Sequence, residues 1–456
     1  MFCMAPPNGS HAWRDYRTIW RWHFYAGLFC IPFILLLSLS GSIYLFKPQI
    51  DAWLDHPYDH LKLTGHPTSA HAQIQAALTA VSGSTLFAYE LPTAPDGATR
   101  IIVTIRGERI RVYVHPETLE ILKTIPEEDR FTRMVFHFHG ELLMGNIGSA
   151  FVELAASWAI IMIVTGWVLW WPRTEEGLGG MIYPRLHRGL RGFWRDLHAV
   201  TGFWISIFVL FLLVTGLPWA KVWGEYFKEI RRLTGTTAIE QDWTVGATPR
   251  NPLPESSEEH LDHGNQATNP VRAKEMLSDY SPVDLLLPTV RSLNLPSPVF
   301  IFPPPQVEGY WTTKSDTQNR PQRVKVWLDA STGNILKREN FQDRHVLDRM
   351  VGIGVAAHEG QLFGWPNVAV GVFAASGLLI LAISGMLMWW YRRPSGILGA
   401  PPPFPSQPFP IGFKLLLGGF CVSLPLFSAS VLSIFLIEKL ILRRCPPLVH
   451  WLGLNR

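Results

Sequence analysis

The chain has 456 residues, of which 48% are hydrophobic and only 17% are charged, and its formal net charge is +4. Charged residues make up about a quarter of an ordinary soluble domain. This composition, together with 19 Trp, therefore indicates a chain that faces lipid in several places. The small net charge, with Lys and Arg gathered beside apolar stretches, argues against a nucleic-acid-binding face.

Four cysteines are scattered along the chain without CxxC spacing, which argues against a cysteine-built zinc site, an iron–sulfur site or a disulfide framework. They are Cys3, Cys30, Cys421 and Cys445.

Five stretches are apolar over the about 20 residues that a helix needs to cross the hydrocarbon core. They are Phe24–Phe46, Phe151–Trp171, Ala199–Ala220, Val368–Trp390 and Phe413–Ile437. The first is too long for a signal peptide and has no small-residue cleavage site after it, so we expect an uncleaved anchor. The spans divide the chain into an N-terminal segment with the first span (1–46), a first outer domain (47–147), two spans joined by a basic loop (148–220), a second outer domain (221–366), and the last spans with a C-terminal tail (367–456).

Basic residues in the short flanks predict the orientation. Arg14, Arg17 and Arg21 precede the first span, arginines fill the loop after the second, and Arg392 and Arg393 follow the fourth. We assign this side to the cytoplasm and the outer domains to the opposite side, which in a bacterium is the periplasm. A fifth full span would place the basic residues of the C-terminal tail outside. Either the fifth helix is peripheral to the orienting set, or it does not fully cross.

Spans one and three share a pattern, and so do spans two and four. In WRWHFYAG and WRDLHAVTG the His is followed by Gly at +4 and +18, and in FHGELLMG and AHEGQLFG by Gly at +6 and +27 and by a Trp pair at +31 and +32. The histidines are His23, His198, His139 and His358, and the glycines are Gly27, Gly41, Gly202, Gly216, Gly145, Gly166, Gly364 and Gly385. The sequence therefore predicts a parallel internal repeat of helix, outer domain and helix.

The outer domains resemble each other more weakly. Each has a helical pattern (about His71–Val81 and Pro282–Leu293) before a strand, a turn and a strand, in RVYVHPETLEILKTI and VKVWLDASTGNILKREN. The polar stretch Thr236–Ala273 is predicted to be a loop or mobile linker. The predicted fold class is thus a membrane all-α bundle of four or five transmembrane helices, with two α+β outer domains.

The four repeated histidines lie at helix ends, in two pairs on opposite membrane faces. Neutral imidazole is a good axial ligand for haem iron, and two such ligands on facing helices can sandwich a porphyrin. Gly27 and Gly202, one turn beyond His23 and His198 on the same face, would leave room for a flat macrocycle. The opposing interpretation is that interfacial histidines bond to headgroups or backbone, and that the other repeated glycines serve helix packing. His137, which aligns with Ala356, is a weaker candidate.

The chain resembles the PepSY-associated transmembrane-helix family up to about residue 395. The resemblance rests on WRWHFYAG, WRDLHAVTG, FHGELLMG with its distal WWPR, AHEGQLFG with WWYRR, and VWLDASTGNIL, a strand–turn–strand typical of PepSY domains. The first copy, PETLEIL, lacks the glycine of the second. The resemblance implies a bacterial inner-membrane protein with periplasmic PepSY domains. Some relatives are ferric-siderophore reductases in which helix-end histidines ligate haem b. It therefore implies that His23, His198, His139 and His358 bind haem b, with two groups expected.

The function so implied is electron transfer across the membrane. The donor would be a quinol or a cytoplasmic reductase, and the acceptor a ferric siderophore or other ferric chelate at the periplasmic surface. One continuous helix from His139 to Trp170 would measure about 46 Å, more than the about 30 Å hydrocarbon core. We therefore expect a helix interruption near Gly145, and another near Gly364 and Pro366, that folds each histidine back towards the bundle.

Two other functions are open. The chain could be a non-enzymatic membrane module whose outer domains bind or regulate a partner, or it could be a transporter, which a parallel repeat permits. Transport is disfavoured because no charged residue stands at mid-span. The chain has no GxGxxG fingerprint, so a reductase would need a separate electron donor, and no HExxH protease motif.

Overall fold

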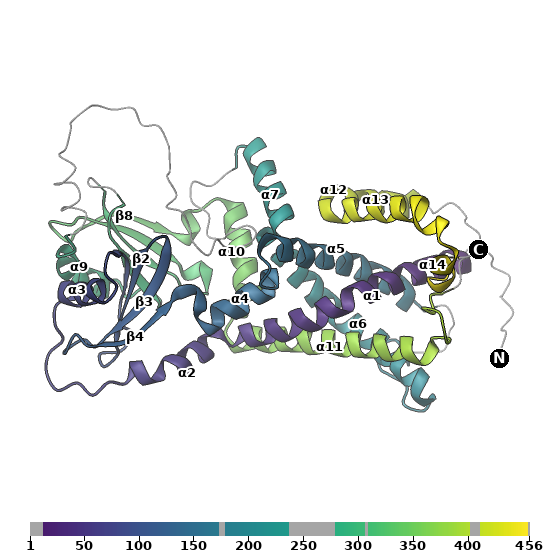
Figure 1. The fold of residues 1–456 in the computed structure, drawn as a ribbon, viewed down its shortest axis with the longest axis horizontal. Coiled ribbons are helices and arrows are strands. Elements are labelled where there is room, and N and C mark those ends of the chain that lie inside the picture. The colour runs from purple at the N-terminus through teal and green to yellow at the C-terminus, as the bar shows by residue number, and fades with distance from the viewer. Residues whose placement is uncertain (1–11, 173–177, 237–278, 306–308, 402–410, 455–456) are drawn as a thin grey trace.

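The computed structural model describes residues 12–172, 178–236, 279–305, 309–401 and 411–454. A β-sheet with its helices lies at one end of the molecule, and a bundle of long helices forms the other, where both termini lie (Figure 1). We call these ends the sheet side and the terminal side.

Four long helices form the bundle: α1 (Ala12–Leu45), α5 (Gly145–Trp170), α6 (Gly189–Gly216) and α11 (Trp365–Arg392). Their apolar stretches are candidate membrane spans over Tyr16–Leu45, Gly145–Trp170, Gly189–Trp219 and Trp365–Arg392, which confirms the first four predicted spans. A helix suits lipid because it satisfies its backbone polar groups internally. Leu39, Ile207 and Phe373 point outward with at least half of each residue exposed, as side chains in contact with lipid do.

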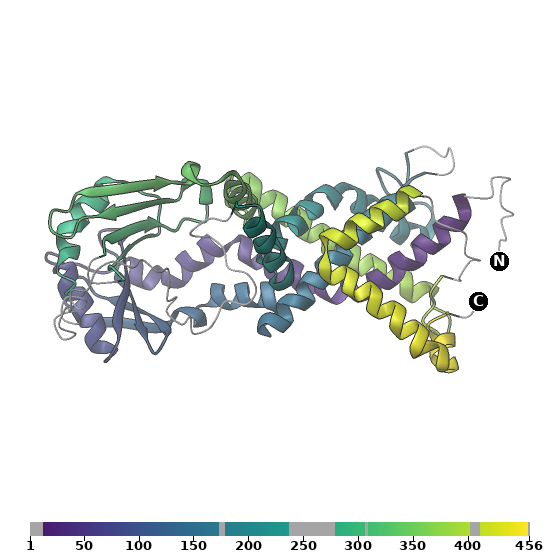
Figure 2. The ribbon, with the colours of Figure 1, turned by 90° about the horizontal axis from the view of Figure 1, so that it is seen from above.

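The predicted fifth span is wrong as a single helix. It is a pair of helices, α12 (Ile411–Ser423) and α13 (Pro425–Leu440), bent by 117° at Leu424. Pro425 has no N–H, and its ring disfavours helical backbone at the residue before it, so the helix breaks there. Figure 2 shows the pair as a V with both open ends towards the terminal side. Leu424 and Phe427 at the apex are buried against Ile160 and Leu217, so the pair is packed onto the bundle.

This V predicts that the C-terminus lies on the same side of the membrane as the N-terminus. Four crossings and a helix pair that enters and returns would put Arg444 on the same side of the membrane as Arg392 and Arg393, as the positive-inside rule requires. A C-terminal green fluorescent protein fusion is expected to fluoresce, and a C-terminal alkaline phosphatase fusion to be inactive. Fusions at Asp59, on the sheet side, are the control and should show the reverse. An active C-terminal phosphatase would mean that α12 and α13 cross as one span.

In the described part of the chain, eight strands form one antiparallel sheet in the order β4-β3-β2-β1-β5-β6-β7-β8. They are β1 (Thr85–Glu90), β2 (Thr99–Ile105), β3 (Glu108–Val114), β4 (Ile121–Pro126), β5 (Val299–Phe302), β6 (Trp311–Ser315), β7 (Val324–Leu328) and β8 (Ile335–Asn340). Each outer segment contributes four consecutive strands, and β1 pairs with β5 at the centre. The two predicted outer domains therefore share a single sheet, because each leaves its first strand unpaired on one side.

One apolar core lies beneath this sheet. The helices α3 (Ala70–Ala80) and α9 (Pro282–Ser292) pack there, which confirms both helices predicted for the outer segments. Ile74 and Leu286 from these helices meet Ile101 and Val326 from the strands, and all four are completely buried. The core therefore draws on both outer segments.

The strand–turn–strand units keep the same turn without the same residue. Leu119 in the first unit has φ +63°, and Gly333 in the second has φ +71°. The left-handed conformation costs a non-glycine residue about 1–2 kcal/mol, but the Leu119 side chain packs against the apolar core. At the position of this glycine, the first unit thus has Leu119, whose side chain adds apolar contacts to the core.

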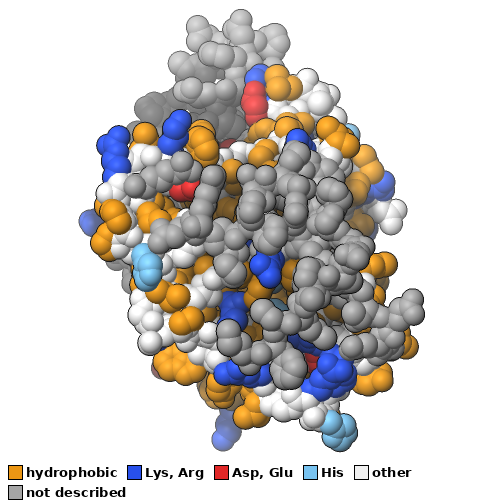
Figure 3. Space-filling model, turned by 90° about the vertical axis from the view of Figure 1, so that its right-hand side faces the viewer, with side chains coloured by type: hydrophobic (Ala, Val, Ile, Leu, Met, Phe, Trp, Pro, Cys, Tyr) orange, Lys and Arg blue, Asp and Glu red, His pale blue; other side chains and the backbone are white. Residues whose placement is uncertain are grey.

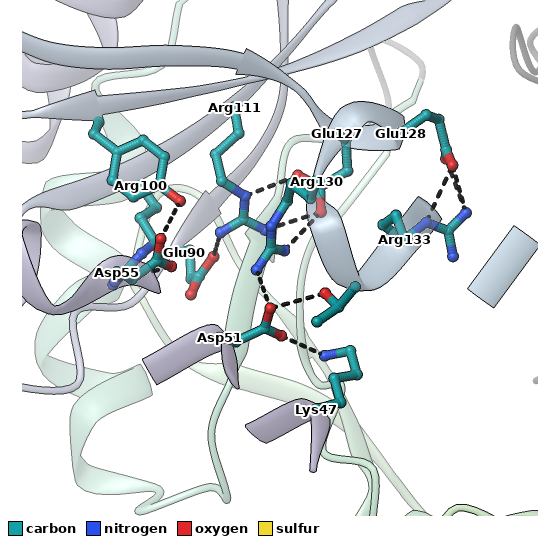
Figure 4. A network of polar contacts seen from close by, with 12 residues as sticks. Lys47, Asp51, Asp55, Glu90, Arg100, Arg111, Glu127, Glu128, Arg130 and Arg133 are labelled. Atoms are coloured by element: carbon teal, nitrogen blue, oxygen red, sulfur yellow. Dashed lines mark hydrogen bonds and ion pairs between the residues drawn. The ribbon is translucent and has the colours of Figure 1, made fainter. Parts of the chain in front are cut away.

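A buried network of ion pairs connects the sheet to the helices beside the membrane (Figure 4). Arg111 on β3 contacts Glu90 on β1 and Glu127, which begins the short turn before α4. Arg130 contacts Glu127 and also Asp51 on α2 (Lys47–Asp59). The sheet is therefore bonded to the elements that continue into the bundle.

The predicted helix interruptions are confirmed in both halves. α4 (Phe131–Glu141) ends before α5, and α10 (Val346–His358) ends before α11. Gly145 and Gly364 have φ +62° and +63°, which glycine adopts without strain. Another helix, α7 (Lys221–Leu233), follows α6 on the sheet side, and α14 (Pro446–Trp451) ends the described chain. Short 3₁₀ turns lie at Glu127–Asp129, Leu217–Trp219, Arg320–Gln322, Phe341–Asp343 and Leu442–Arg444. Apart from Thr236, the predicted linker Thr236–Ala273 lies outside the described residues.

Candidate functional site

The first histidine pair lies between α1 and α6 near the terminal side. The imidazole centroids of His23 and His198 are 6.5 Å apart, and the ring planes are at 87°. His23 contacts Thr165 on α5 and His198 contacts Ser384 on α11, so both side chains face neighbouring helices of the bundle.

The second pair lies towards the sheet side. His139, near the end of α4, and His358, at the end of α10, have centroids 6.4 Å apart and planes at 79°. The breaks after α4 and α10 fold these short helices onto the bundle, so that His139 reaches Ser40 on α1. Ser40 is 17 residues beyond His23, which places the two pairs about 25 Å apart along α1.

The Nδ1 atom of each histidine lies at hydrogen-bond distance from a hydroxyl on a neighbouring helix. The partners are Thr165 for His23 (3.0 Å), Ser384 for His198 (3.0 Å), Ser40 for His139 (2.9 Å) and Thr215 for His358 (3.0 Å). Each hydroxyl also donates its proton to a backbone carbonyl in its own helix, so it can only accept from the imidazole. With each hydroxyl proton donated to its carbonyl, the ring proton lies on Nδ1 and the lone pair on Nε2.

Each ring also packs over a glycine. A Cβ atom would lie 3.1 Å from the ring at Gly41, 3.5 Å at Gly166, and 3.6 Å at Gly216 and Gly385. The facing rings are those of His139, His23, His358 and His198, respectively. The sequence suggests that these glycines serve helix packing. In the structure, the absence of a side chain at each of them leaves room for a histidine ring. One sequence feature could have indicated these contacts, because a hydroxyl residue stands directly before each glycine: Ser40-Gly41, Thr165-Gly166, Thr215-Gly216 and Ser384-Gly385.

A cavity of about 820 Å³ adjoins the first pair, a size within the range of small-molecule sites. Its lining includes His23, His198 and both glycines singled out from the sequence, Gly27 and Gly202. A Cβ at either glycine would make only ordinary contact, 3.6 Å from Met162 or Leu381. These glycines therefore widen the cavity rather than relieve a clash.

The centroid separations of the two pairs match those of a metal held between two imidazoles. A metal–imidazole bond of about 2.0–2.1 Å places two rings on opposite sides of one metal with centroids about 6.4 Å apart. The observed separations are 6.5 and 6.4 Å. Among the residues that the structure describes, no group of three or more His, Cys, Asp or Glu could hold a metal ion. Two imidazoles suit a metal whose other positions are filled by its own macrocycle, as in haem.

The other histidines have different surroundings. His137 contacts Glu128 at 2.6 Å through Nε2 and Glu141 through Nδ1, so both of its ring nitrogens have carboxylate partners. His345 caps the start of α10 by accepting from the Leu347 N–H. The structure therefore brings the four predicted ligands together as two pairs, His23 with His198 and His139 with His358, and leaves His137 and His345 outside both.

The chain matches a family model described as the PepSY-associated TM region over residues 20–392. Comparison with curated protein sequences gives no match.

Proposed function

As the chain belongs to the PepSY-associated transmembrane family, we propose that it is a haem-dependent reductase of ferric chelates in a bacterial cytoplasmic membrane. One observation carries this proposal: two histidine pairs with ligand geometry, at opposite ends of one helical bundle. The sheet would lie in the periplasm and the Arg-rich ends of the spans in the cytoplasm.

The four ligands would be His23 and His198 on the terminal side and His139 and His358 on the sheet side. Haem b supplies reversible one-electron chemistry when it is bound. The protein's part is to hold each Nε2 lone pair towards the site, which the hydroxyl partners of Nδ1 do by fixing the tautomer and ring orientation. Apolar walls such as Ile31 and Ile205 limit the access of water to the first pair.

The proposed donor is a quinol or a cytoplasmic reductase, and the proposed acceptor is a ferric siderophore or other ferric chelate at the sheet side. Fe(II) has a lower charge and is softer than Fe(III), so a chelate built from hard oxygen donors releases it more readily.

The test uses the full chain, purified from cells supplied with a haem precursor. We expect a Soret band, a sharp α band on reduction, and about two haems per chain by the pyridine haemochromogen assay. The protein in proteoliposomes, with reductant enclosed on its terminal side, should then reduce a ferric chelate on its sheet side. Failure to bind haem under these conditions would refute the proposal and favour a module that binds a protein partner.

A hydroxyl partner gives a milder test of the same site. Ser384→Ala is expected to weaken haem retention at the first pair by about 10–100-fold, because the second-shell contact orients the ligand ring. Ser42→Ala is the matched control, since Ser42 bonds only to the backbone carbonyl of Ser38 among its described contacts. Haem titration of the apoprotein measures both. Equal affinities in the two variants would show that Ser384 does not position His198.

A further inference from the structure

Arginines lie around the mouth of the cavity beside the first histidine pair. Five of them line it: Arg185, Arg188, Arg191, Arg195 and Arg392. The terminal end of the molecule shows many basic and few acidic side chains (Figure 3). The cavity therefore combines apolar walls in the bundle with a cationic rim.

Two of these arginines have their charge offset locally. Arg185 and Arg195 both pair with Asp196, which is almost completely buried, at 2.7 and 2.6 Å. This arrangement fixes the loop against α6.

Arg191 and Arg392 hold matched positions above the histidine pair. Arg191 precedes His198 by seven residues on α6, and Arg392 follows Gly385, which packs against His198, by seven residues on α11. Seven residues are two helical turns, or about 10 Å, so both arginines share the histidine's face and stand nearer the terminal side. The Arg392 guanidinium lies 4.7 Å from the Trp20 ring and 5.3 Å from the Phe24 ring, beside His23 in the chain.

We propose that Arg191 and Arg392 bind two carboxylates at one edge of the molecule that occupies this cavity. This inference rests on the proposed function, in which the occupant is a haem with two propionates. Guanidinium groups form bidentate, charge-assisted bonds to carboxylates, and these bonds gain strength beside an apolar wall. The clamp orients the macrocycle with its carboxylate edge towards the terminal side and its apolar edge into the bundle.

The test compares haem with its dimethyl ester, which keeps the iron and the ring but loses both carboxylate charges. Apoprotein of a His358→Ala variant isolates the first site, and the ligands are titrated by the Soret band. The unmodified rim is expected to bind haem at least about tenfold more tightly than the ester, as charge-assisted bonds predict. Arg191→Gln and Arg392→Gln should each weaken haem binding by about tenfold while leaving ester binding unchanged. Arg393→Gln, with the same charge change on the residue directly after α11, should alter neither.

Each other outcome decides against the clamp. Equal binding of haem and ester by the unmodified rim, or unchanged haem binding in both glutamine variants, would overturn it while leaving the haem proposal intact. If the His358→Ala protein does not accumulate, the full chain is titrated and the first site is identified as the phase that His198→Ala removes. A full chain that binds no haem would refute the proposed function itself.

Discussion

Replacing His358 by Ala is expected to leave about one haem per chain instead of two, and replacing His198 by Ala should do the same at the other site. Each pair supplies two imidazoles at 6.4–6.5 Å, and loss of one ring leaves only one protein ligand for the iron. The double variant should retain almost none. Haem content by the pyridine haemochromogen assay and protein content by amino-acid analysis give the ratio.

The control for this experiment is His187→Ala, an exposed histidine in the basic loop. It should keep the full haem content. The spectra carry a second readout, because each single variant should retain the sharp α band of the intact pair. Loss of both haems from either single variant, with the protein still folded, would mean that the two pairs do not form separate sites.

Replacing Arg111 by Ala is expected to destabilise the sheet by about 3–5 kcal/mol, the cost of breaking a buried ion pair, because Glu90 loses this partner and Glu127 keeps only Arg130. The Arg111 side chain is 5% exposed, and its loss would leave Glu90 and Glu127 without their shared cation (Figure 4). Thermal unfolding in detergent micelles, followed by fluorescence, measures the change. The matched control is Arg338→Ala on the exposed strand β8, for which we expect less than about 0.5 kcal/mol. Equal effects of the two would contradict a structural role of the network.

The same network predicts a dependence on pH. Burial alone would raise the pKa of Glu127, but Arg111 and Arg130 overcome burial and hold that pKa at about 2. A carboxylate whose folded pKa is depressed stabilises the fold above its unfolded pKa, and this contribution is lost as pH falls through the folded value. The wild-type sheet should therefore lose stability between about pH 4.5 and pH 2. The Arg111→Ala protein, already lacking the attraction, should show a smaller loss over this range.

Much of the bundle could be predicted because hydrophobic length and glycine offsets are local properties of the chain. The first four spans, the breaks near Gly145 and Gly364, and the proximity of His23 to His198 all followed from such patterns. The break at Pro425 was missed, since apolar residues continue on both sides of it and hide the bend.

The rest depended on contacts between distant segments. No local pattern in β1 or β5 indicates that Glu90 lies opposite Phe300. The sequence therefore did not predict that the two outer segments share one sheet. The hydroxyl partners are visible in the sequence as a recurring dipeptide, but Ser40 and Ser384 contact His139 and His198 only because the fold brings these rings to them from other helices. Likewise, the ion pair of Arg111 with Glu127 requires the sheet and the turn before α4 to meet.

The pairing of β1 with β5 restricts how the two halves can move. Tyr89 pairs with Ile301 and Glu90 with Phe300, and the Leu91 N–H donates to the Val299 carbonyl at 2.8 Å. A solute carrier made from two repeated halves moves one half against the other. In this chain such a movement would have to break the hydrogen bonds between β1 and β5 and separate the apolar core that both outer segments share. The shared sheet thus restricts the movement of the two outer segments relative to each other. A bundle with this restriction suits electron transfer, which, unlike the transport of a solute, does not require a path through the protein to open.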